Sequence, residues 1–143
     1  MALDLGKKRI GLAVSDPMGV TAQGLPTLQR TRIRDDLDEL ARMAGQYEVR
    51  LILMGHPMHM SGRESRQAVY TKEFAERLAG RTGLPIEYWD ERWTTVAAER
   101  VLKESGISIE KRARAVDQLA AVILLESYLD SLPGASGPIY EGE

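Results

Sequence analysis

The fold is decided near the start of the chain, where residues 2–15 read ALDLGKKRIGLAVS. Two short apolar runs flank a polar turn at residues 6–8, and in the second run branched apolar residues alternate with small ones. Alternation with a period of two on either side of a Gly-containing turn predicts a β-hairpin. Residues 16–19 supply turn chemistry before a third extended run at residues 20–29. Three antiparallel strands are therefore expected first.

The apolar pattern of the remaining chain alternates between helical and extended periods. Helical spacing is found in residues 33–47, 61–83, 94–106 and 116–132. Residues 49–54 and 85–89 are short apolar runs that predict further strands. The expected fold is α/β: a mixed five-stranded sheet, with a three-strand antiparallel meander and two crossover strands, and helices on both faces. Residues 1–132 are expected to form one domain, and residues 133–143 a flexible tail.

Composition limits the function classes. The 143 residues are 43% hydrophobic and 28% charged, as in an ordinary soluble domain. The absence of cysteine excludes disulfides, thiolate nucleophiles and Cys-based metal sites, and no segment approaches the ~20 apolar residues of a membrane span. These features favour a cytoplasmic protein. The net charge of −2 argues against a general polycation, so any nucleic-acid binding must use local basic clusters.

Three acidic residues from separated segments lie beside apolar sequence. Asp4 lies within the first strand, Glu91 comes two residues after the end of the strand at residue 89, and Asp117 opens the last expected helix. A carboxylate beside a core costs on the order of several kcal/mol unless a partner compensates it. Convergence on divalent metal would satisfy all three, and oxygen ligands suit Mg²⁺, with Mn²⁺ as a substitute. Such a site can hydrolyse phosphodiesters.

A structural interpretation of the same acids stays open at this point. Asp4 could pair with Arg9 or Lys7, and Glu91 with its neighbour Arg92. Asp117 could cap the last helix. The sequence does not prove that the three acids meet.

Basic residues precede or follow these acids closely. Lysine and arginine that contact phosphates position a nucleic acid without reading its sequence. Residues 107–114 are expected to be a flexible basic linker able to close over a strand, although such runs are also common in solvated connectors. The candidate phosphate contacts are Lys7, Lys8, Arg9, Arg63, Arg66, Arg92, Lys111, Arg112 and Arg114.

Taken in order, the motifs resemble those of the YqgF/RuvX family. They are LDLGKKRIGLAVSD (3–16), GHP (55–57) followed by Gly62, DERWTT (90–95) and VDQLAA (116–121). The resemblance spans residues 2–132 and implies an RNase H-like fold. It also implies nuclease activity, assigned in the family to Holliday junction resolution in DNA recombination or to maturation of the pre-16S rRNA 5′ end in ribosome biogenesis. Carried over by motif, Asp4, Glu91 and Asp117 would be the catalytic and metal-binding acids.

Two further functions are considered. An ATPase of the actin and hexokinase kind begins with a similar phosphate loop, but it needs two such domains, and 143 residues suffice for one. A non-catalytic RNase H-like module that binds nucleic acid or regulates a partner would need no acid triad, so the three acids favour a nuclease. A junction resolvase is expected to form a homodimer, whereas RNA trimming needs only one site.

Overall fold

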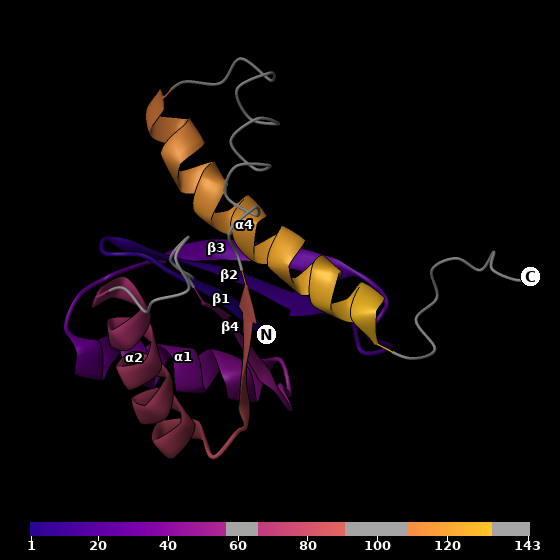
Figure 1. Cartoon of the computed structure of the whole chain (residues 1–143), viewed down its shortest axis with the longest axis horizontal. Helices are drawn as coiled ribbons and strands as arrows, with labels where there is room; N and C mark the ends of the chain where they lie inside the picture. The colour runs from indigo at the N-terminus through magenta and orange to yellow at the C-terminus, as the bar shows by residue number, and fades with distance from the viewer. Residues whose placement is uncertain (57–65, 91–108, 133–143) are drawn as a thin grey trace, which may run out of the picture.

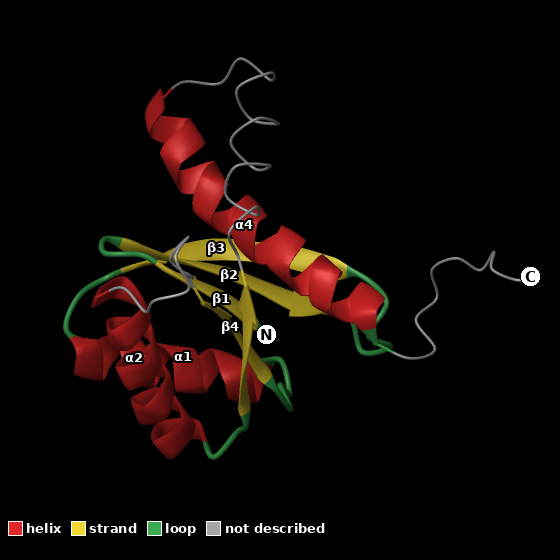
Figure 2. Ribbon diagram, in the orientation of Figure 1, coloured by secondary structure: helices red, strands yellow, loops and turns green. Residues whose placement is uncertain are grey.

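The computed structural model describes residues 1–56, 66–90 and 109–132. It has three layers, with one sheet between two helices on one face and a long helix on the other (Figures 1 and 2). The helix expected at residues 94–106 and the tail expected from residue 133 lie outside the described residues. In the described ranges, no helix is both long and apolar enough to cross a membrane.

The sheet has the predicted mixed topology. Strands β1 (Ala2–Leu5), β2 (Arg9–Ser15) and β3 (Ala22–Gln29) form the antiparallel meander. Strands β4 (Ile52–His56) and β5 (Ile86–Asp90) follow by crossovers and run parallel to β1. The order is β3-β2-β1-β4-β5, so the four-residue strand β1 is central.

The helices bury opposite faces of the sheet. Helices α1 (Ile33–Gln46) and α2 (Arg66–Thr82) cover one face, and α4 (Ile109–Ser131) crosses the other diagonally (Figure 2). Leu3, Leu5 and other large residues fill the core under α1 and α2. Ala2, Ala13 and Leu53 face α4 instead, against its Ala121, Leu124 and Leu125. Small residues on this face of the sheet let α4 approach closely.

Three predicted boundaries are wrong, each for a local reason. The third strand begins at Ala22 rather than residue 20, because the carboxylate of Asp16 accepts the backbone N–H groups of Val20 and Thr21 at 2.7 and 2.8 Å and extends the turn. The fourth strand covers 52–56 rather than 49–54, because the Val49 N–H donates to the Ala44 carbonyl at 2.8 Å to close α1.

The third wrong boundary is the start of the last helix, which was expected to follow a linker at residues 107–114. Helix α4 begins at Ile109, so most of the expected linker is helical. Residues 109–115 contain neither Gly nor Pro and are mainly good helix formers, so the helix continues through the basic run. The flexible segment expected to close over a nucleic-acid strand is therefore replaced, from residue 109 onward, by a rigid element.

Candidate active site

Asp4 lies in the middle of the sheet on the face that α4 covers. Its neighbours Leu3 and Leu5 face α1 and α2, whereas Ala2 faces α4, so strand alternation directs the half-buried Asp4 to the α4 side. Gly11 of β2 is its cross-strand partner. Because Leu3 is in register with Met54, one further step along β4 brings Gly55 beside Asp4. Both flanks of this carboxylate thus lack a side chain.

Three parallel strands end at the edge near Asp4. The last residues of β4 and β5, His56 and Asp90, are in register with each other, and β1 ends one residue beyond Asp4. Carboxyl ends of parallel strands are where open α/β sheets collect ligand-binding groups. Glu91 follows Asp90 in the chain but lies outside the described residues, as do Arg63 and Arg92.

The turn of α4 that contains Asp117 is fixed to the sheet by a hydrogen bond from a neighbouring residue. The neighbouring Gln118 donates from its side-chain amide to the Leu25 carbonyl at 2.7 Å. Leu25 is in register with Leu12, and Leu12 with Leu3, the residue before Asp4. The backbone of Asp117 is therefore anchored over the row of the sheet that adjoins Asp4.

The alternative role for Asp117 as a helix cap is wrong. Helix α4 begins eight residues earlier, at Ile109, so Asp117 lies inside the helix. An N-cap has non-helical dihedrals and precedes the first turn. Lys111, Arg112 and Arg114 also belong to the first turns of α4, and the structure describes only their backbone.

An aromatic contact fixes the other half of α4 against β5. Trp89 packs edge-to-face on Tyr128 with 5.4 Å between ring centroids, and its indole N–H donates to the Ser127 hydroxyl at 3.1 Å. Burial raises the pKa of Tyr128, and the nearby Glu87 raises it further. The helix is thus held at both ends of its path across the sheet, by Gln118 over β3 and by these aromatic rings at β5.

The basic turn of the first hairpin begins two residues after Asp4. Lys7 and Lys8 are exposed, and the Gly6 N–H donates to the Arg9 carbonyl at 2.9 Å. A Cβ at Gly6 would lie 2.7 Å from that carbonyl oxygen, so only glycine fits this tight turn. The turn is also bound to the end of β3, because the Arg30 N–H donates to the Lys8 carbonyl at 2.9 Å.

Arg30 is a residue that sequence reasoning missed. Its guanidinium donates to the Gly6 carbonyl at 2.8 Å, to the Asp36 carboxylate at 2.9 Å and to the Tyr70 hydroxyl at 2.6 Å. It also lies over the rings of Tyr70 and Phe74, at 5.8 and 5.3 Å from their centroids. One side chain therefore connects the basic turn to both α1 and α2. The signal in the sequence was an arginine followed six residues later by an acid, a spacing that is too common in proteins to predict such a network.

The structure brings some predicted residues together and leaves others as predictions. Asp4 and the basic turn share one edge of the sheet, and the exposed Arg66 begins α2. Among the described residues, no group of three acidic or histidine side chains is placed to hold a metal ion. Since Glu91 and the side chain of Asp117 are not among them, the convergence of the triad stays a prediction.

Comparisons with known proteins agree with this architecture. The chain matches solved structures of Thermus thermophilus RuvC, one in complex with a Holliday junction substrate (TM-score 0.56, 15% identity, 89% of this chain and 90% of that one) and one titled as RuvC alone (TM-score 0.51, 11% identity, 89% and 91%). At these identities the likeness shows the fold alone. The protein therefore has an RNase H-like fold, as the sequence predicts.

Closer relatives give the family. The family model RuvX, described as Holliday junction resolvase, matches residues 1–131. Relatives named "Putative pre-16S rRNA nuclease" come from Koribacter versatilis (50% identity, 91% of this chain and 85% of that protein) and Clostridium novyi (45%, 92% and 98%). The chain belongs to the RuvX family, and the nuclease function predicted from the sequence is supported by this membership.

Proposed function

We propose that this protein is a divalent-metal-dependent endonuclease that hydrolyses phosphodiester bonds in structured nucleic acid. Asp4, Glu91 and Asp117 would hold Mg²⁺, which Mn²⁺ could replace. The observation that most directly supports the proposal is the place of Asp4, a half-buried carboxylate on the central strand between two glycines.

The chemistry of the donor set fits magnesium. Carboxylate oxygens are the ligands that hard divalent cations prefer, and the neighbouring strand positions Gly11 and Gly55 place no side chain beside Asp4. When bound, Mg²⁺ supplies positive charge that stabilises the attacking and leaving oxygens of a phosphodiester. Asp4 itself belongs to a strand that is paired on both sides, so its carboxylate is held without a large loss of entropy during the reaction.

The basic turn would position the substrate. Lys7 and Lys8 are exposed directly after the strand that bears Asp4, where they can contact phosphates on either side of the cleaved bond. Such contacts hold the backbone and read no sequence, so recognition would depend on the shape of the nucleic acid. Arg66 at the start of α2 could add a further contact from the same edge.

The substrate is inferred from the relatives. We place precursor 16S rRNA first, because curated relatives at 43–50% identity over most of the chain bear that name. A four-way DNA junction is second, from the description of the family. Junction resolution would require two sites and hence a homodimer. Either role is consistent with a cytoplasmic protein.

Cleavage of defined substrates tests the proposal. The parent, Asp4→Asn, Asp117→Asn and the control Asp130→Asn, which removes an exposed acid from the same helix, would be incubated with labelled 16S precursor 5′ leader RNA, a four-way DNA junction and single-stranded RNA. We expect cutting in Mg²⁺ or Mn²⁺ but not in EDTA, and roughly hundredfold or greater loss only in the first two variants. Titration of Mn²⁺ by calorimetry gives a readout independent of activity.

Two outcomes would contradict the proposal in different ways. If Asp4→Asn cut as fast as the parent, the assigned acids would be wrong. If the parent bound the RNA tightly but cut nothing in any metal, the non-catalytic binding module would be the better interpretation.

A further inference from the structure

The charge of this protein is strongly uneven along one edge. Residues 6–9 and 30–36 contain six basic and two acidic side chains, a net charge of +4, although the whole chain carries −2. The remaining residues together therefore carry −6. The two segments are far apart in the sequence but adjacent in space, because the Arg30 N–H donates to the Lys8 carbonyl at 2.9 Å. We call this surface the basic edge; its cations are Lys7, Lys8, Arg9, Arg30, Arg32 and Arg34.

The cations at the start of α1 differ from two other exposed arginines of the α1–α2 layer. Arg42 pairs with Glu39, and Arg81 pairs with Asp38. Arg32 and Arg34 are exposed, and within the described residues neither forms an ion pair. Cations that the protein's own acids do not neutralise are available to an external anion.

One of the two acids in the basic edge does not weaken it. Asp36 is only 1% exposed, and it accepts hydrogen bonds from Arg30 and from the backbone and hydroxyl of Thr31. Its charge is therefore compensated inside the protein. Asp35 alone remains exposed against the lysines and Arg32 and Arg34.

The basic edge is also preorganised. The Arg30 guanidinium joins the Gly6 carbonyl to Asp36 and to Tyr70, so the hairpin turn and the first turn of α1 are fixed to each other. Figure 1 shows the hairpin turn and the starts of α1 and α2 at the same side of the molecule. A polyanion that contacts the turn beside Asp4 can thus reach Arg32 and Arg34 without rearrangement of the backbone.

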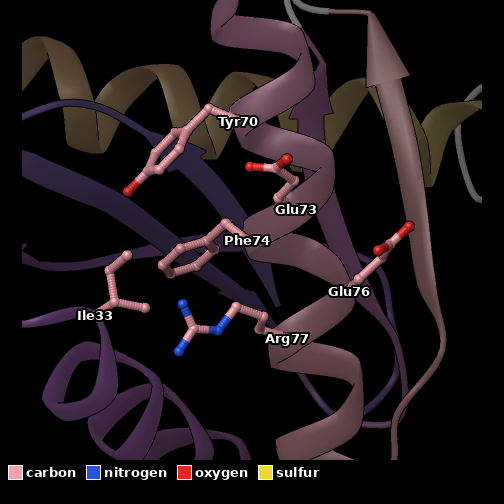
Figure 3. A pocket seen from close by; sticks show the side chains of 6 residues that line it. All are labelled: Ile33, Tyr70, Glu73, Phe74, Glu76 and Arg77. Carbon is pink, nitrogen blue, oxygen red and sulfur yellow. The ribbon is translucent and has the colours of Figure 1, made fainter.

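The basic edge is bordered by a hollow on the side of α2. It has a volume of about 350 Å³ and lies between Ile33 of α1 and the residues of α2 that include Tyr70, Phe74 and Glu73. Figure 3 shows the aromatic rings directed toward Ile33 and a carboxylate of Glu73 beside them. Glu73 and Glu76 line the hollow together with Arg77, a net charge of −1, so it attracts a phosphate backbone less than the start of α1 does. The favourable path therefore passes Arg32 and Arg34 rather than crossing α2.

We propose that nucleic acid bound at Asp4 extends over the basic edge, where Arg32 and Arg34 contact phosphates of a segment away from the cleaved bond. This inference rests on the proposed function, since it needs a nucleic-acid substrate. It explains how a protein of net negative charge holds a polyanion. It also assigns recognition of an extended, structured substrate to the α1 face, opposite the helix that contains Asp117.

Binding measurements with matched variants test this surface. Arg32→Gln/Arg34→Gln is compared with Arg42→Gln/Arg50→Gln, which makes the same change of charge at exposed positions elsewhere. Affinity for labelled 16S leader RNA and for a four-way DNA junction is measured by fluorescence anisotropy in EDTA, over a series of salt concentrations. All positions are exposed, so both variants should melt at the temperature of the parent.

The expected result separates the two pairs. Loss of two phosphate contacts should weaken binding roughly tenfold and reduce the salt slope by about 1.4 to 1.8 for Arg32→Gln/Arg34→Gln. The control pair should change affinity by less than about twofold.

Failure of the inference can be distinguished from failure of the proposed function. Equal affinities and salt slopes for the two pairs would overturn the inference, while cleavage by the parent would leave the nuclease standing. A parent that binds both probes and cuts neither would refute the nuclease, yet the anisotropy comparison would still decide the surface. A parent that binds neither probe would overturn both.

Discussion

Arg30 and Asp36 form a buried ion pair, with 2.9 Å between Nε and Oδ2, at the junction of the basic hairpin turn with helix α1. Their side chains are 9% and 1% exposed. The same guanidinium also reaches Gly6 and Tyr70, so the pair is part of a network between elements. Burial of both charges makes the network intolerant of losing one partner.

Asp36→Ala should therefore be strongly destabilising. It leaves the Arg30 charge buried without its carboxylate, and removal of one member of a buried pair costs about 3–5 kcal/mol. Urea denaturation should show this loss of unfolding free energy, whereas the exposed neighbour substituted as Asp35→Ala should change it by less than about 0.5 kcal/mol. Equal effects of the two substitutions would show that the network contributes nothing to stability.

Gly11→Ala should impair cleavage by protein that is still folded. Gly11 lies directly opposite Asp4, and only Gly19 and Gly83 have positive φ among the described glycines, so alanine is compatible with the backbone. The added methyl narrows the space beside the Asp4 carboxylate. We expect cleavage by the folded protein, well below its thermal midpoint, to fall at least roughly tenfold, since small misplacements at a reacting centre are costly. Because Gly11 is buried on the face that α4 covers, the midpoint itself should also fall.

The control for this prediction is Gly80→Ala. No atom lies within 4 Å of a Cβ built at this helical position, so alanine should stabilise the protein by about 0.5–1 kcal/mol and leave cleavage unchanged. An active Gly11→Ala protein would show that the space beside Asp4 is not used.

Gly24→Ala and Gln118→Ala should have coupled effects on stability. A Cβ at Gly24 would lie 2.8 Å from Cγ of Gln118 and displace the amide that donates to Leu25. Each substitution alone should cost about 1–2 kcal/mol through loss of this part-buried hydrogen bond. The double variant should cost no more than Gln118→Ala, because the alanine then has space. Additive losses in a thermal double-mutant cycle would contradict the contact.

Glu73→Gln should strengthen nucleic-acid binding. The residue is exposed on α2 at the hollow that borders the basic edge, and its removal reduces repulsion of phosphate. Anisotropy at low salt should show affinity raised by roughly twofold, and the gain should vanish as salt is increased. Glu48→Gln, exposed in the turn that follows α1, should give no gain. A gain that persists at high salt would not be electrostatic.

Much of the fold was predictable because its signals are local. The hairpin and the two crossover strands correspond to short apolar runs between turns in the sequence. The structure confirms their order and the mixed sheet. Predicted boundaries were wrong where a single hydrogen bond decided them, accepted by the side chain of Asp16 in one case and donated by the backbone of Val49 in the other. The basic run before Asp117 was predicted to be a linker because the prediction rested on its charge and not on its helix propensity.

The site was predictable only where a motif pointed to it. The face of the strand on which Asp4 lies follows from its alternation with Leu3 and Leu5, whereas its two glycine neighbours follow only from the register. The Arg30 network could not be inferred, because Tyr70 lies 40 residues away and Asp36 looked like an ordinary first-turn acid. Metal binding by Asp4, Glu91 and Asp117 stays a prediction.

The basic edge gives the molecule an electric dipole that its net charge conceals. Among the described residues, +4 is gathered along one side and the remainder carries −4, and a body with such charges turns as it diffuses toward a polyanion and arrives with the positive side leading. A polyanion that meets the acidic side of the protein is repelled rather than held there. Under the proposed function, productive encounters with nucleic acid would therefore begin at the side where β1 ends, and the acidic remainder would limit nonspecific adhesion to the abundant nucleic acid of a cell.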